Sequence, residues 1–298
     1  MTPQHRATLI GFSSIVQWGA LALLTSLTGG HIPPFQMLAM TFVVAFLLML
    51  LNSWRQGQTG LEHAKQPWLA WLLGVGGLFS YHFFYFLAMG KAPAVDVSLI
   101  AYLWPLLIVL FAALLPGEHL SRYHVLGAVI ALGGCWLLVG GGSQGFNSAY
   151  LAGYLAASAC AVIWAAYSVA NRLTKDVPTD AVGWFCGVVA LLGLACHLLW
   201  EQTVLPVDAK GWIGVIGLSL GPLGVSFFTW DYGVKHGNLQ LLGVLSYAAP
   251  LISVLLLIAF GKAEAEWTLL LACAAIIGGA WVAQRAQPPQ PNESGQPK

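Results

Sequence analysis

Charged side chains are scarce in this chain of 298 residues, because Asp, Glu, Lys and Arg together make up only 8% of it. A soluble domain carries about 25% charged residues. Hydrophobic residues make up 58% of the chain, and its net charge of +1 leaves no basic face for nucleic acid. This composition excludes an ordinary soluble enzyme, a nucleic-acid-binding protein and a disordered protein, and it predicts that the lipid bilayer is the solvent of the chain.

Motifs for metal, redox and nucleotide chemistry are also lacking. The five cysteines lie in apolar runs without a Cys-x-x-Cys pair, so we interpret them as small core residues. No His-Glu-x-x-His sequence occurs, and the glycine-rich segment 140–145 lacks the Lys-Ser/Thr of a phosphate-binding loop. Residues 217–221 match Gly-x-Ser-x-Gly, which leaves an intramembrane enzyme as a minor alternative, although that motif requires a strand–turn–helix context. We expect no catalytic residues, metal or cofactor, and no obligatory protein partner is inferred.

Long apolar segments are what the chain has in abundance. A membrane-spanning helix needs about 20 mostly apolar residues. Ten such spans are predicted, at residues 7–28, 35–54, 67–89, 94–115, 121–140, 149–171, 180–200, 210–232, 238–260 and 266–284. The first span is too long for a cleaved signal peptide, and residues 286–298, rich in Pro and Gln, are predicted to form a disordered tail. The chain is therefore predicted to be an all-α integral membrane protein.

The distribution of Lys and Arg predicts the orientation of the spans, because short cytoplasmic loops are enriched in these residues. With the N-terminus in the cytoplasm, nine of the 12 Lys and Arg residues lie on the cytoplasmic side and three lie outside. The opposite orientation would reverse this ratio. Ten spans return the chain to its starting side, so both termini are expected in the cytoplasm.

An internal repeat divides the chain into two halves. Matching residues coincide after a shift of 145 or 146 residues: Tyr102 with Tyr247, Pro105 with Pro250, and Trp18 with Trp164. Residues 1–145 and 146–285 are therefore predicted to be two repeats of five spans each. Since five is odd, the two repeats must have opposite orientations in the membrane. Inverted repeats around a central substrate site are typical of secondary transporters.

Several short motifs of the first half resemble a known superfamily. They are the segment 88–92, the run 99–105, the Pro-Gly-Glu turn at 116–118 and the glycine pair at 133–134. On these residues the chain resembles the drug/metabolite transporter superfamily, in its ten-helix branch with two inverted EamA-type repeats. The blocks 81–85 and 102–105 are similar to those of aromatic amino acid exporters in that branch. The resemblance implies export from the cytoplasm by alternating access through a central cavity, although Ala263 stands where the repeat predicts a second Glu.

Polar and aromatic side chains inside the spans are the candidates for the cavity wall, because buried hydroxyl and indole groups need partners or water. The candidates are Gln17, Trp18, Tyr81, His82, Tyr85, Ser98, Tyr102, Trp104, Trp164, Tyr167, Trp230 and Tyr247. An aromatic wall with hydroxyl and imidazole tips suits a zwitterion with an apolar or aromatic side chain, and it also suits a planar cation. Each candidate taken singly is alternatively a packing residue.

His82 is interpreted as the ionisable side chain nearest the middle of a span, and such a group indicates function. It is expected to line the cavity, with structural hydrogen bonding as the alternative. His197 and Asp231 lie nearer span ends and are expected to be solvated at the membrane interface.

Two prolines fall inside predicted spans at equivalent positions of the repeat. Pro105 and Pro250 each remove one backbone hydrogen bond and are expected to kink their helices. The kinks are candidate hinges for alternating access by tilting of spans 3, 4, 8 and 9, with a static bend as the alternative.

The sequence therefore predicts a bacterial inner-membrane exporter of aromatic and other neutral amino acids. An exporter of planar cationic drugs or of another small metabolite remains the alternative. The absence of an Asp or Glu at the membrane midplane disfavours cation exchange through a buried carboxylate. The coupling ion, if any, is left open.

Overall fold

The structure is a computed structural model that describes residues 1–140, 145, 147–264 and 266–286. All regular elements in these described ranges are helical. The predicted tail at 286–298 lies outside the described residues except for Ala286, and so does most of the glycine-rich segment 140–145.

Ten helical segments are long and apolar enough to cross a membrane in the described part of the chain, which confirms the predicted number. Six of the spans are single α-helices apart from short flanking turns: α3 (Pro34–Arg55), α4 (Trp68–Met89), α7 (Arg122–Val139), α8 (Leu151–Ala170), α9 (Ala181–Trp200) and α14 (Trp267–Gln284). The other four spans are interrupted: α1–α2 (Pro3–Gly19, Leu21–Leu27), α5–α6 (Ala94–Ala101, Trp104–Ala112), α10–η5–α11 (Ala209–Leu220, Gly221–Val225, Ser226–His236) and α12–α13 (Leu239–Leu245, Ala248–Ala259). Span 1 begins earlier than predicted, at Pro3, and span 8 continues to His236.

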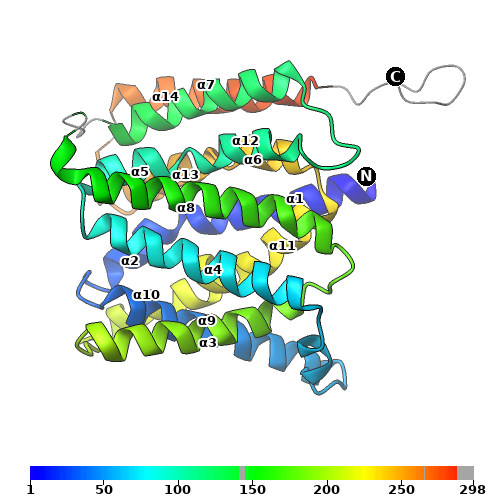
Figure 1. Ribbon diagram of the computed structural model, residues 1–298. Coiled ribbons are helices and arrows are strands. Elements are labelled where there is room, and N and C mark those ends of the chain that lie inside the picture. The colour runs from blue at the N-terminus through cyan, green and yellow to red at the C-terminus, as the bar shows by residue number, and fades with distance from the viewer. Residues whose placement is uncertain (141–144, 146, 265, 287–298) are drawn as a thin grey trace, which may run out of the picture.

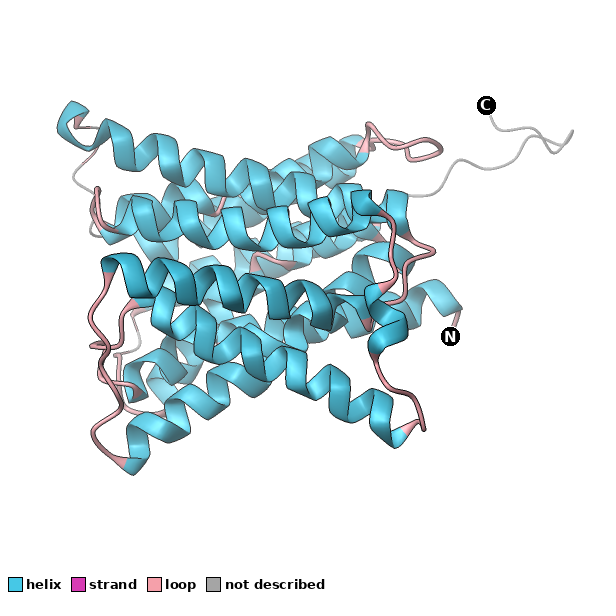
Figure 2. Ribbon diagram, turned by 60° about the horizontal axis from the view of Figure 1, so that its bottom comes forward, coloured by secondary structure: helices cyan, strands magenta, loops and turns pink. Residues whose placement is uncertain are grey.

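Successive spans run in alternating directions, so both described ends of the chain lie at one end of the bundle, on the right of Figure 1. This end is called the termini end here, and the other is called the opposite end. Span 1 starts at the termini end, whereas α8, the first span of the second half, starts at the opposite end. The two halves therefore run in opposite directions, as the odd number of spans requires. Figure 2 shows the same helical bundle, with the connecting loops gathered at its two ends.

The spans pack in pairs that join the two halves. The most extensive contacts are between α7 and α14, α3 and α9, α4 and α8, and α1 and α11 (Figure 1). Small residues allow these close approaches. A Cβ added to Gly233 would lie 2.4 Å from the Cα of Gly11, and one added to Gly127 would lie 2.4 Å from the carbonyl oxygen of Gly279. The pair α1–α11 is equivalent to the pair α8–α4 under the repeat, so the bundle contains two related helix pairs that face each other.

Three of the four interruptions lie near prolines, the exception being the α1–α2 break at Ala20. The α5–α6 break, at Tyr102 and Leu103, directly precedes the first turn of α6, which holds Pro105. The α12–α13 break directly precedes the first turn of α13, which holds Pro250. A third proline, Pro222, lies in the π-helical turn η5 and was not singled out from the sequence. Proline cannot donate a backbone hydrogen bond, and π-helical turns are frequent at functional sites.

Candidate functional site

A cavity of about 460 Å³ lies between the two helix pairs and reaches the opposite end of the bundle. Its outer part is lined by the loop after α2 and by the last turn of α4, including Thr28, Ile32, Pro34 and Met89. Eighteen of its 23 lining residues precede residue 145, and five follow it. None of the 23 is Asp, Glu, Lys or Arg. The cavity is thus uncharged apart from one histidine, and it is built mainly by the first half of the chain.

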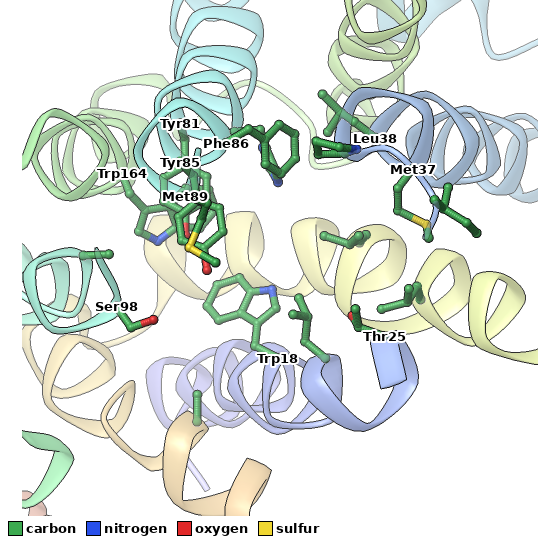
Figure 3. A pocket seen from close by; sticks show the side chains of 18 of the residues that line it. Trp18, Thr25, Met37, Leu38, Tyr81, Tyr85, Phe86, Met89, Ser98 and Trp164 are labelled. Carbon is green, nitrogen blue, oxygen red and sulfur yellow. The ribbon is translucent and has the colours of Figure 1, made fainter. Parts of the chain in front are cut away.

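Eight of the twelve candidate side chains line this cavity. They are Trp18, Tyr81, His82, Tyr85, Ser98, Tyr102, Trp104 and Trp164. Figure 3 shows Trp18 on one side of the space, with Tyr81, Tyr85 and Met89 of α4 facing it and Ser98 at the side. The structure thus brings together aromatic residues from spans 1, 3, 4 and 6.

Four indole rings form a compact cluster between the cavity and the termini end. The rings belong to Trp18, Trp104, Trp164 and Trp230, one from each of α1, α6, α8 and α11. All six distances between their ring centroids lie between 5.0 and 6.4 Å. Edge-to-face contacts at this spacing stabilise aromatic pairs. Since three of these rings also line the cavity, the cluster acts as its floor.

Hydrogen bonds from two indoles fix the position of this floor. The indole Nε1 of Trp18 donates to the carbonyl oxygen of Pro222 at 3.2 Å and to the hydroxyl of Ser226 at 3.1 Å. The indole of Trp230 donates to the hydroxyl of Ser168 at 3.0 Å. The first pair of bonds joins span 1 to the π-helical turn of span 8, and the last bond joins α11 to α8. These hydrogen bonds therefore attach the floor to η5 and α11 through Trp18 and to α8 through Trp230.

The helix α4 supplies a second group of aromatic rings. The rings of Tyr81 and Tyr85 are stacked, with centroids 6.2 Å apart and an angle of 12° between their planes. The imidazole Nδ1 of His82 lies 2.7 Å from the carbonyl oxygen of Leu78. Because a carbonyl oxygen can only accept, Nδ1 carries a proton, and Nε2 is the acceptor of the neutral ring. A cavity residue with this tautomer can accept a hydrogen bond from a ligand N–H group.

Four of the candidates do not line the cavity in this conformation. Gln17 donates to the backbone of Ser13 at 3.1 Å. Tyr167 and Trp230 are buried between helices, and Trp230 is the ring of the indole cluster that does not line the cavity. Tyr247 has no exposed surface, and its hydroxyl accepts a hydrogen bond from a backbone N–H at the first turn of α6. The polar tips of Trp230 and Tyr247 therefore bond to other helices, and the amide of Gln17 bonds within its own helix.

The cavity also contains residues that the sequence analysis missed. Leu21, Thr25 and Thr28 of span 1 line it, as do Phe86 and Met89 of α4. A signal for them was present. Leu21, Thr25 and Thr28 follow Trp18 at intervals of three or four residues, which places them on one helix face, and Met89 follows Tyr85 in the same way.

The expectation that Asp231 and His197 are solvated at the interface was wrong, because both are buried and have protein partners. The carboxylate of Asp231 pairs with the ammonium of Lys235 at 2.9 Å and accepts a hydrogen bond from Thr179 at 2.8 Å. The imidazole of His197 lies 2.9 Å from the carboxylate of Glu201. Buried charges require such partners. Lys235 and Glu201 lie four residues after Asp231 and His197, whereas Thr179 comes from a segment that the sequence does not place beside Asp231.

The glycine-rich serine motif at residues 217–221 is part of a helix and not of a strand–turn–helix. The hydroxyl of Ser219 donates to the backbone carbonyl of Val215 at 2.7 Å. This arrangement lacks the exposed serine of a nucleophile elbow.

Comparison with known proteins agrees with this architecture. The family model described as "EamA-like transporter family" matches residues 5–140 and 151–284. A protein named aromatic amino acid exporter YddG from Ancylobacter novellus is 51% identical over 93% of this chain and 96% of its own length. A protein of the same name from Salmonella typhimurium is 30% identical over 85% of this chain and 87% of its own. A crystal structure with 50% sequence identity superposes with a TM-score of 0.90, over 94% of this chain and 96% of the other. The chain belongs to the EamA-like transporter family.

Proposed function

We propose that this protein exports aromatic and other neutral amino acids from the cytoplasm by alternating access. The single observation that carries the proposal is an aromatic, uncharged cavity that is open at one end and closed at the other by four indoles. The name of the relative with 51% identity, aromatic amino acid exporter, supports the same substrate class.

The distribution of basic residues supports the direction of transport. Eight of the 11 Lys and Arg residues that the structure describes belong to the termini end or its loops, which supports assigning this end to the cytoplasm. The cavity then opens away from the cytoplasm, and the structure is the outward-open state. The relatives are bacterial, and we place the protein in the bacterial inner membrane.

The chemistry of the wall favours an amino acid zwitterion. Moving an uncompensated charge into an apolar site is costly, and this cavity offers no charged residue to compensate it. A zwitterion has no net charge, and its two ionic groups can bond to neutral polar groups. We assign the ammonium to the imidazole Nε2 of His82 and the carboxylate to the hydroxyls of Ser98, Tyr81 and Tyr102. The aromatic rings of the floor are then free to stack on the substrate side chain.

The second candidate is export of a planar cation, and one observation favours it. Three indoles and three tyrosines on the wall provide the ring faces that attract cations. The lack of any carboxylate on the wall weighs against this candidate, because a bound cation would have no counter-charge.

The helix breaks before Pro105 and Pro250 are proposed as the hinges. They lie at equivalent positions of the two halves and divide spans 4 and 9 into short helices. Backbone groups freed by a helix break can change partners at low cost, so the short helices can tilt independently.

Transport by the purified protein in liposomes tests the proposal. Liposomes preloaded with unlabelled Phe are expected to accumulate labelled Phe, Trp, Thr or Met in exchange, with no ion gradient applied. The variant Trp164→Ala, which opens the floor, is expected to lose this exchange, whereas Trp267→Ala, a residue that is 72% exposed, retains it. Transport of ethidium without transport of any amino acid would reject the amino acid assignment and support the planar-cation alternative.

A further inference from the structure

The cavity wall of the first half has an equivalent in the second half, at the termini end. Span 1 contributes Trp18, Leu21 and Thr25 to the open cavity. A shift of 146 residues carries these three positions to Trp164, Tyr167 and Asn171 on α8 and η4 (Asn171–Thr174). On the facing helix, a shift of 145 carries Tyr85 of α4 to Trp230 of α11. The faces that border the open cavity therefore recur, in the same pairing, at the other end of the bundle.

In this conformation the recurring faces are pressed together. Tyr167, Asn171 and Trp230 are each at most 5% exposed. The indole of Trp230 donates to Ser168 of α8, and η4 packs against α11. The space that corresponds to the open cavity is thus closed at the termini end.

Asn171 carries a polar group that this closed state leaves without a well-formed hydrogen bond. Its side-chain Nδ2 is buried and makes no hydrogen bond of ordinary distance and angle among the described residues, and the nearby polar group is the hydroxyl of Tyr167. Such groups are rare in folded proteins, because burial removes their hydrogen bonds to water. The equivalent residue in the first half, Thr25, lies on the wall of the open cavity. The poorly bonded amide of Asn171 in this closed state is explained if it binds a ligand when the termini end is open.

We propose that Tyr167, Asn171 and Trp230 form the substrate site of the cytoplasm-open state. This proposal rests on the export function proposed above. The amide Nδ2 of Asn171 donates to the carboxylate of the incoming amino acid, and the rings of Tyr167 and Trp230 contact its side chain. The two states then use equivalent faces of the two halves to hold the same zwitterion.

The neighbouring residue, Arg172, closes this site in the outward-open state. Its NH1 donates to the carbonyl oxygens at the C-terminal end of α11, those of Val234 at 3.0 Å, Lys235 at 3.2 Å and Gly237 at 2.8 Å. These carbonyls are unpaired within the helix and carry its negative dipole end. Separation of η4 from α11 requires Arg172 to release them.

Glu118 gives Arg172 a partner that need not be released. Its carboxylate accepts a hydrogen bond from NH2 of Arg172 at 2.7 Å. The two side chains are 18% and 28% exposed, so water already reaches both. In contrast, Asp231 and Lys235 are each only 2% exposed. The guanidinium can therefore leave α11 without being stranded in an apolar site.

Side-specific kinetics test the site. Transport into everted membrane vesicles presents substrate to the cytoplasmic face, and transport into right-side-out vesicles presents it to the outer face. Asn171→Ala is expected to raise KM for Phe at the cytoplasmic face by about tenfold, the size expected for a lost hydrogen bond to a charged group. KM at the outer face should change by less than about twofold. Thr25→Ala, the matched control, is expected to show the reverse preference.

The outcomes separate this inference from the export function itself. If the unaltered protein transports no amino acid, the proposed function fails. If it transports Phe, but Asn171→Ala changes KM equally at both faces or at neither, the cytoplasm-open site is rejected. An unchanged KM at the outer face also shows that the variant is folded.

Accessibility of the site provides a second measurement. A cysteine in the variant Asn171→Cys is buried in the outward-open state and should react slowly with a membrane-impermeant methanethiosulfonate at the cytoplasmic face. Addition of Arg172→Gln to this variant is expected to speed the reaction, because the clamp on α11 is lost. A reaction that is no faster with Arg172→Gln would contradict the role of Arg172.

Discussion

The two halves of the chain share one repeat but contribute unequally to the cavity. The first half supplies eighteen of the 23 lining residues, and the second supplies five. Tyr102 lines the cavity, whereas its equivalent, Tyr247, is fully buried and caps a backbone N–H of α6. The difference shows that a single conformation exposes one copy of the wall and uses the other copy as packing. Substitution of the buried copy should therefore lower stability, whereas substitution of the equivalent residue on the cavity wall should affect transport.

The largest difference is expected between Trp230 and its equivalent, Tyr85. Trp230 is 1% exposed, so Trp230→Ala should lower the free energy of unfolding by about 3–5 kcal/mol. Tyr85 borders the cavity, and Tyr85→Ala should lower it by about 1 kcal/mol or less. Thermal unfolding in detergent measures both, with the exposed Trp267→Ala as a control. Equal losses of stability for the two variants would remove the distinction between wall and packing.

A smaller effect is expected for the equivalent tyrosines. Tyr247→Phe leaves the partly buried N–H of Leu106 without its acceptor at 3.2 Å, so we expect a loss of about 1–3 kcal/mol in stability. Tyr102→Phe should change stability by less than about 0.5 kcal/mol and act on transport instead. Unfolding curves and Phe exchange, measured on the same preparations, compare the two. A stability loss for Tyr102→Phe as large as that for Tyr247→Phe would contradict the comparison.

His82 has Phe227 as its equivalent, which lines the cavity without a polar atom. His82→Phe fits the same aromatic surroundings but removes the Nε2 acceptor. We expect KM for Phe to rise by about tenfold, since ~1.4 kcal/mol corresponds to that factor. Exchange kinetics in liposomes provide the measurement, with the exposed His119→Phe as control. An unchanged KM would assign His82 to structure and not to binding.

The smallest effect on stability is expected at the closed end of the bundle. Glu118→Gln removes the ion pair with Arg172, whose side chains are partly exposed to water. Such pairs contribute about 0.2–1 kcal/mol and weaken as salt rises. Unfolding at low and at high ionic strength should show a small difference from the unaltered protein that shrinks with salt. A large, salt-independent loss would place this pair in the structural core.

Much of the architecture could be predicted from the sequence because lipid imposes simple requirements. Each span must be apolar and about 20 residues long, and the coincidence of Tyr102 with Tyr247 revealed the repeat. The aromatic character of the wall was also readable, because polar tips such as the Tyr81 hydroxyl stand out within an apolar span. These signals are local or depend only on spacing along the chain.

The remaining features depend on tertiary contacts that no spacing encodes. The sequence does not say which copy of a repeated wall is exposed, because that is a property of the conformation and not of the composition. Asp231 and Lys235 stand four residues apart, a spacing that permits a pair on one helix. Their burial, however, depends on Thr179 and Val177 from the loop between η4 and α9. Likewise, Pro222 was visible in the sequence, but its carbonyl became significant only through the indole of Trp18.

The floor of four indoles also has an optical consequence. Indole rings whose centroids lie within 6.4 Å of one another interact electronically, so the cluster is expected to contribute to the circular dichroism of the protein. Trp164 and Trp230 stand on α8 and α11, the two helices that would separate in the proposed cytoplasm-open state. Each transport cycle would therefore uncouple and recouple these rings, and the near-ultraviolet circular dichroism of the unlabelled protein would follow its conformation directly.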